Sequence, residues 1–131
     1  MHRILVVEDE MLVAFALSEG LQDLGARVTL ADTAEQALEA MLTTAFSAAI
    51  IDIGLPGLRG DEFARECRAR FPLMPIVLAT GMDEHEIRAL FVADPHLSVI
   101  EKPHEFSVIQ TALEKLGVTF SSREAEPLAT S

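Results

Sequence analysis

Two hydrophobic patterns alternate along the chain. Short, nearly continuous apolar runs are typical of strands in a parallel sheet that is covered on both faces. Between these runs, apolar residues recur every three or four positions, which is the period of an amphipathic helix. The runs that predict strands lie at 4–7, 28–30, 48–53, 76–79 and 98–100, and the helical segments lie at about 10–24, 33–42, 61–70, 84–93 and 105–116.

Several residues mark the ends and buried sides of these helices. Gly25 is a plausible C-terminal stop for the first helix. Asp32 or Thr33 can cap the second helix, with Glu35 or Gln36 as the returning half of a capping box. The residues expected on buried sides are Val13, Leu17, Leu21 and Leu24 in the first helix, Ala37, Leu38, Met41 and Leu42 in the second, and Phe63, Cys67 and Phe71 in or just after the third.

The alternation of five strands with five helices predicts one α/β domain built on a single parallel sheet. The chain has 131 residues, half of them apolar, which is enough to bury a sizeable core. Residues 118–131 have no sustained period, and we expect a mobile tail there, after a folded domain at 1–117.

Charge and composition exclude several classes of function. A net charge of −11 without a basic face argues against binding to nucleic acid. A single cysteine, Cys67, excludes an intramolecular disulfide and is expected in the core. No apolar run approaches the length of a membrane span, and the N-terminal run is too short for a signal peptide. We therefore expect a cytoplasmic protein with no membrane partner.

Polar side chains stand at the ends of four predicted strands. Glu8 and Asp9 follow the first strand, Asp52 lies near the end of the third, Thr80 follows the fourth and Lys102 the fifth. Parallel strands end at one edge of the sheet, where ligands bind in such folds, so these groups should meet there. The second strand contributes no such group, as expected for an edge strand.

This combination of side chains favours phosphoryl chemistry. Three converging carboxylates repel one another and should hold a divalent cation, and hard oxygen ligands with room for waters suit Mg²⁺. Lys102 can neutralise one further acid, and the hydroxyl of Thr80 can hydrogen-bond an oxyanion. Around a nucleophilic Asp52, these parts fit acceptance of a phosphoryl group.

Each residue alone also has a plainer explanation. Asp52 could be a turn or cap residue, and Glu8 and Asp9 could stabilise the start of the first helix through its dipole. Thr80 could be an ordinary hydroxyl at a strand end, and Lys102 a solvated side chain. The joint pattern, with each group at the end of the appropriate strand, favours the functional interpretation.

At these residues the sequence resembles the receiver domain of two-component response regulators, over about residues 3–117. The motifs that carry the resemblance are Val-Val-Glu8-Asp9-Glu10, Asp52-Ile-Gly-Leu-Pro56-Gly-Leu-Arg-Gly60, Ala-Thr80-Gly81 and Glu-Lys102-Pro103. The resemblance implies that Asp52 receives a phosphoryl group from a sensor histidine kinase or a histidine phosphotransfer protein. It also implies that Asp9 and Asp52 ligate Mg²⁺, with Mn²⁺ as an alternative, that Glu8 contributes through water, and that the carbonyl of Gly54 completes the protein ligands.

The same resemblance implies a flavodoxin-like, doubly wound (βα)5 fold with strand order 2-1-3-4-5. Such a protein is a signalling phosphoacceptor that assists its own phosphorylation and dephosphorylation, and not an enzyme in the usual sense. An output protein, or a second copy on phosphorylation, is expected at the face formed by 84–93, 98–100 and 105–116. We expect a stand-alone receiver; the alternatives are a receiver of a hybrid histidine kinase and a phosphate sink.

One position departs from the family pattern. An aromatic residue three positions before the lysine normally swings inward on activation, and here that position is Val99. His96 and Phe91 are the nearest candidates to replace it, although His96 is expected in an exposed loop. Leu78-Ala79-Thr80-Gly81 weakly resembles the Phe-Ala-Thr-Gly signature of a receiver subgroup that also lacks this aromatic.

Three rival classes fit the residues less well. A flavin carrier of the same fold needs a phosphate loop after the first strand, where this chain has acids that would repel a phosphate. An aspartate-nucleophile phosphatase needs an acid two residues after Asp52, where this chain has Gly54. A pseudo-receiver that only binds partners is expected to lack part of the constellation, which is complete here.

Overall fold

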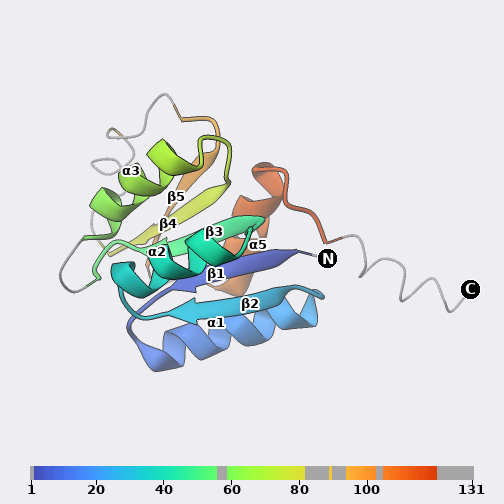
Figure 1. Ribbon diagram of the computed structural model, residues 1–131. Coiled ribbons are helices and arrows are strands. Elements are labelled where there is room, and N and C mark those ends of the chain that lie inside the picture. Colours follow the sequence, from blue (N-terminus) through green and yellow to red (C-terminus); the bar gives the residue numbers. More distant parts are fainter. Residues whose placement is uncertain (1, 56–58, 82–88, 90–93, 103–104, 121–131) are drawn as a thin grey trace, which may run out of the picture.

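The computed structural model describes residues 2–55, 59–81, 89, 94–102 and 105–120. Five parallel strands form one sheet in the order β2-β1-β3-β4-β5, which confirms the predicted flavodoxin-like fold and strand order (Figure 1). The strands are β1 (Arg3–Val7), β2 (Arg27–Ala31), β3 (Ala48–Asp52), β4 (Ile76–Thr80) and β5 (Leu97–Glu101), and the described helices are α1 (Met11–Asp23), α2 (Ala34–Thr43), α3 (Gly60–Arg70) and α5 (Phe106–Lys115). The helix expected at 84–93 lies outside the described residues, except for Ala89.

The sheet is covered on both faces, and each face has its own hydrophobic core. Alternate residues of β1 point to opposite cores, with Leu5 and Val7 on the side of α2 and α3, and Ile4 and Val6 on the side of α1 and α5 (Figure 1). All five residues of β3 and of β4 are buried, because these strands lie inside the sheet. The continuous apolar runs in the sequence reflect this double burial.

The helix termini follow the predicted signals. The hydroxyl of Thr33 accepts a hydrogen bond from the backbone N–H of Gln36 at 3.1 Å, and Oε1 of Gln36 accepts one from the N–H of Asp32 at 3.0 Å. Gly25 has φ 93°, a conformation that favours glycine, and its N–H donates to the carbonyl of Gln22. These bonds satisfy backbone groups that every helix end leaves unpaired.

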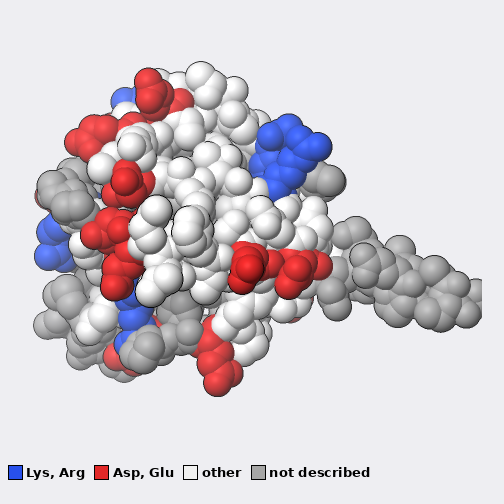
Figure 2. Space-filling model, turned by 90° about the horizontal axis from the view of Figure 1, so that it is seen from below, with Lys and Arg blue, Asp and Glu red and all other residues white. Residues whose placement is uncertain are grey.

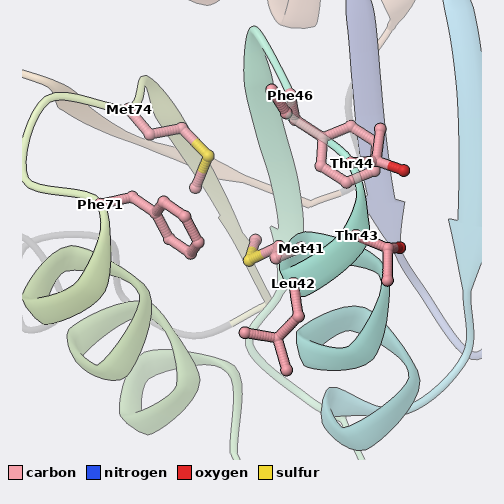
Figure 3. A pocket seen from close by; sticks show the side chains of 8 residues that line it. Met41, Leu42, Thr43, Thr44, Phe46, Phe71 and Met74 are labelled. Atoms are coloured by element: carbon pink, nitrogen blue, oxygen red, sulfur yellow. The ribbon is translucent and has the colours of Figure 1, made fainter.

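The prediction that Leu42 is buried was wrong. Met41 is 5% exposed, whereas Leu42 is 65% exposed, because the buried stripe of α2 runs through Ala34, Ala37 and Met41. Leu42 lies instead at the rim of a groove of about 350 Å³ between the C-terminal ends of α2 and α3 (Figure 3). The groove is lined by Met41, Leu42, Thr43, Thr44, Ala45, Phe46, Phe71 and Met74.

Cys67 is a core residue, as predicted. Its side chain is fully buried in α3, and its Sγ lies 3.6 Å from the Sδ of Met41 in α2. Burial raises the pKa of the thiol to about 12, so the reactive thiolate is suppressed at neutral pH.

The packed chain extends beyond residue 117, where we expected a mobile tail to begin. Val118 and Phe120 are 3% and 8% exposed and belong to the core on the side of α1 and α5. Two apolar side chains in a short extended segment leave no periodic signal, which explains why the sequence pattern missed them. Residues 121–131 lie outside the described part of the chain.

Among the residues that the structure describes, no helix is both long enough and apolar enough to cross a bilayer.

Met41 and Leu42 offer a matched test of the helix orientation. Met41→Ala should lower the free energy of unfolding by about 2–4 kcal/mol, because it leaves a cavity between α2 and α3. Leu42→Ala should change it by less than about 0.5 kcal/mol, since the side chain is already largely in solvent. Urea denaturation measures both values, and equal losses would contradict the orientation of α2.

Candidate functional site

The register of the sheet brings the predicted site residues to one edge. Asp52 is the last residue of β3 and pairs with Ala79 of β4, and Thr80 pairs with Glu101 of β5. Glu8 and Asp9 directly follow β1, and Lys102 directly follows β5. The N–H of Lys102 donates to the carbonyl of Thr80 at 2.7 Å, which ties the start of the following segment to β4.

Lys102 bridges the two buried acids of the site. Its Nζ lies 3.0 Å from Oδ1 of Asp52 and 3.7 Å from Oε1 of Glu8. The side chains of Asp52 and Glu8 are only 7% and 4% exposed, whereas that of Lys102 is 24% exposed. Burial alone would lower the pKa of Lys102, but the carboxylates of Asp52 and Glu8 outweigh burial and raise it, so the ammonium stays charged.

The three acids form one cluster. A carboxylate oxygen from each of Glu8, Asp9 and Asp52 lies within 4.8 Å of the others, and Asp9 is the exposed member. Burial, together with the charge of Asp52, raises the pKa of Glu8 from 4.5 to about 7, although Lys102 and the N–H of Glu10 act in the opposite direction. The pocket therefore carries more negative charge than one lysine neutralises.

This donor set fits a hard divalent cation. Carboxylate oxygens that converge from two strand ends, with one acid open to solvent, suit Mg²⁺ and leave room for water ligands. A cation there would also stabilise the ionised form of Glu8, whose pKa is raised mainly by burial and further by the charge of Asp52. The N–H of Gly54 donates to Oδ1 of Asp52 at 3.0 Å. That the carbonyl of Gly54 ligates the metal stays a prediction.

Gly60 lets the first turn of α3 lie against the end of β3, a role that sequence reasoning missed. A Cβ at this position would clash with the carbonyl oxygen of Asp52 and with the Cα of Ile53. The N–H of Gly60 donates to the carbonyl of Ile53 at 3.0 Å. Only glycine allows this close approach, so the presence of a glycine at position 60 is the sequence feature that could have predicted the contact.

A third buried acid, Asp61, was also missed. It is 7% exposed, and its Oδ1 accepts a hydrogen bond from Nε of Arg59 at 2.9 Å. Burial would raise the pKa of Asp61, but the hydrogen bond and charge of Arg59 outweigh burial and lower it. Asp61 stays ionised in the first turn of α3, where a negative charge is favoured by the helix dipole.

Among the described residues, neither position 99 nor His96 provides the aromatic side chain that, in the family pattern, moves inward beside Thr80 on activation. Thr80 is fully buried, and Val99, in the aromatic's place, is 4% exposed and pairs with Leu78 of β4. His96 precedes β5 and so lies at the opposite edge of the sheet. Phe91 lies outside the described residues.

Comparison with known proteins agrees with this geometry. Residues 4–114 match the family model of the response regulator receiver domain. The chain is 32% identical over 117 residues to the transcriptional regulatory protein QseB of Escherichia coli O157:H7, covering 87% of this chain and 52% of that protein. It is 28% identical over 128 residues to FixJ of Bradyrhizobium diazoefficiens, covering 98% of this chain and 60% of FixJ. The chain thus spans about half the length of the curated relatives it matches.

Solved structures show the same fold. A CheY-like receiver domain protein from Methanospirillum hungatei JF-1 superposes with a TM-score of 0.79 at 26% identity, covering 96% of this chain and 98% of that one. Chemotaxis protein CheY4 of Vibrio cholerae superposes with a TM-score of 0.81 at 24% identity, covering 88% and 98%. Fold and site together define a receiver of the CheY-like class. The chain belongs to the response regulator receiver family of two-component systems.

The raised pKa of Glu8 predicts a pH dependence of stability without metal. Because the folded state binds this proton more tightly than the unfolded state, Glu8 contributes stability that is fully present below about pH 4.5 and is lost as pH rises through about 7. Glu8→Gln removes this titration, so the stability of the variant relative to the native chain should rise by on the order of 2 kcal/mol between pH 5 and pH 8. Thermal unfolding in a chelating buffer measures the difference, and parallel pH profiles would contradict the assignment.

Proposed function

We propose that Asp52 accepts a phosphoryl group from a phosphohistidine of a sensor histidine kinase or a histidine phosphotransfer protein. The observation that carries the proposal is the environment of its carboxylate. Oδ1 lies 3.0 Å from the ammonium of Lys102, and Glu8 and Asp9 crowd it from the end of β1. A carboxylate nucleophile at a strand end, with a lysine ammonium beside it, suits covalent transfer.

In the transfer step, a carboxylate oxygen of Asp52 forms a bond to phosphorus while the bond between phosphorus and the donor imidazole breaks. The electron pair returns to the imidazole nitrogen, and Asp52 becomes an acyl phosphate. Lys102 offsets charge on the carboxylate, and Thr80, the last residue of the adjacent strand β4, hydrogen-bonds a phosphoryl oxygen through its hydroxyl. Mg²⁺, held by Asp9, Asp52 and the carbonyl of Gly54 and by Glu8 through water, supplies charge neutralisation when bound, and Mn²⁺ is an alternative.

Phosphorylation adds up to about two negative charges where acids already crowd one another. The added charge gives Lys102 and Thr80 new phosphoryl oxygens to bind. We propose that this shifts a conformational equilibrium and that a partner protein binds one of the two conformations. Val99 is a buried aliphatic side chain, so the shift proceeds without rotation of a ring at that position. The output face stays a prediction, because most of residues 84–93 lie outside the described residues.

An apolar patch beside the site is suited to dock the phosphodonor. Met11, Leu12 and Phe15 of α1 are 63%, 84% and 51% exposed, immediately after the acidic residues 8–10. The patch borders a hollow of about 280 Å³ that Phe106 of α5 helps to line. Figure 2, which looks at the molecule from the side of α1, shows uncharged surface flanked by Asp and Glu. A donor with an apolar centre and a basic rim fits this surface.

Asp52 is the residue to test first. Incubation with a small phosphodonor and Mg²⁺ should add the mass of one phosphoryl group to the native chain, as measured by intact mass spectrometry. Asp52→Asn should abolish the gain, and Asp32→Asn, an exposed aspartate after β2, should not. Omitting Mg²⁺ should also abolish the gain, because the added charge would then be uncompensated. An equal mass gain in Asp52→Asn would refute the assignment.

Leu12→Asp should separate docking from chemistry. With a phosphorylated histidine phosphotransfer protein that phosphorylates the native chain, the variant should react at least about tenfold more slowly, because the patch loses apolar contact and an unpaired carboxylate faces the apolar centre of the donor. Its reaction with the small phosphodonor should stay unchanged. Leu73→Asp is the matched control, since Leu73 is 73% exposed but lies before β4 at the other edge of the sheet. Equal slowing in both variants would argue against docking at α1.

A further inference from the structure

The segment after α5 is held by a complete helix-ending motif. Gly117 has φ 95°, its N–H donates to the carbonyl of Glu114 at 3.0 Å, and the N–H of Val118 donates to the carbonyl of Leu113 at 2.9 Å. These two bonds with a left-handed glycine form a Schellman motif, which reverses the chain. Val118 and Leu113 lie in the same core cluster, which supplies the hydrophobic contact of that motif.

His2 contacts this segment from the other end of the chain. Its Nε2 lies 2.6 Å from the carbonyl oxygen of Thr119, which can only accept, so Nε2 carries the hydrogen. Its Nδ1 lies 3.0 Å from Oγ of Ser47, just before β3, and the imidazole meets the ring of Phe120 edge-on at a centroid distance of 5.6 Å. One half-buried side chain thus joins the starts of β1 and β3 to residues 119–120.

The backbone of His2 is itself fixed on both sides. Its carbonyl accepts from the N–H of Arg27 at 2.9 Å, at the start of β2. The carbonyl of the next residue, Arg3, accepts from the N–H of Ser47 at 2.7 Å. The imidazole therefore projects from a rigid position in the sheet, so little conformational freedom remains to be lost when it binds Thr119.

These contacts lie at the edge of the sheet opposite Asp52. Figure 1 shows the N-terminus beside the segment that returns from α5, at the ends where β1 and β3 begin. The match to the receiver family covers residues 4–114, so His2 and residues 117–120 fall outside it on both sides.

We propose that His2 is a positioning residue that latches residues 118–120 onto the sheet and fixes where the chain leaves the domain. Residues beyond Phe120 then start from the edge opposite the phosphoacceptor. Burial of Val118 and Phe120 favours packing of the segment, and the hydrogen bonds of His2 set its position along the sheet edge. The latch does not depend on phosphorylation of Asp52.

Limited chymotrypsin digestion of the full chain tests the latch, because cleavage after Phe120 requires local opening. His2→Leu keeps an apolar contact for Phe120 but loses both hydrogen bonds, and it should speed this cleavage about tenfold. His2→Gln, whose amide can still donate to Thr119, should give an intermediate rate. His96→Leu is the control, because His96 lies at the same edge and its described hydrogen bonds are all through its backbone.

Urea denaturation of the same variants measures the free energy of global unfolding, which should change little in any of them. A cleavage rate for His2→Leu within about twofold of that for His96→Leu would overturn the proposal, because burial alone would then hold the segment. Equal rates for His2→Leu and His2→Gln would also overturn it, since the bond to Thr119 would carry no positioning role.

Discussion

The structure depends on one electrostatic constraint, the crowding of carboxylates around the end of β3. Glu8, Asp9 and Asp52 bring oxygens within 4.8 Å of one another, and only Lys102 lies among them as a described counter-charge. Burial is the main reason that the pKa of Glu8 is raised, and the negative charge of Asp52 adds to it. A pocket strained in this way favours a ligand that brings positive charge, and in the proposed function such a cation offsets the charge of the incoming phosphoryl group.

The surrounding fold serves to keep this crowding in place. Asp52 cannot move away from Glu8, because its strand is hydrogen-bonded between β1 and β4 and buried along its length. Gly60 lets α3 pack directly on the backbone of Asp52, so the start of α3 holds the end of β3 from this side. On the other side, the bond from the N–H of Lys102 to Thr80 fixes the base of the lysine. Because the sheet is rigid, the carboxylates cannot move apart, and their repulsion is relieved when a ligand brings positive charge.

The sequence was sufficient to predict the sheet and the convergence of the site. Buried parallel strands leave continuous apolar runs, and parallel strands must end at one edge, so Glu8, Asp52 and Lys102 could be brought together without coordinates. The orientation of Leu42 could not be predicted, because helix rotation is set by packing against α3. The contacts of Gly60 and of the pair Arg59–Asp61 depend on how closely the start of α3 approaches β3, which has no periodic signal in the sequence. Val118 and Phe120 are buried in a core formed by residues far away along the chain, which a local sequence pattern does not reveal.

The central claim is that the three carboxylates form a single cation site, and that Glu8 is the member whose raised pKa lets it retain a proton near pH 7. Calorimetric titration with Mg²⁺ at pH 7, in two buffers of different ionisation enthalpy, counts the protons released on binding. With the pKa of Glu8 at about 7, the native chain should release about half a proton per Mg²⁺ bound, and the Glu8→Gln variant should release none. Binding heats for the native chain that do not depend on the buffer would contradict the account.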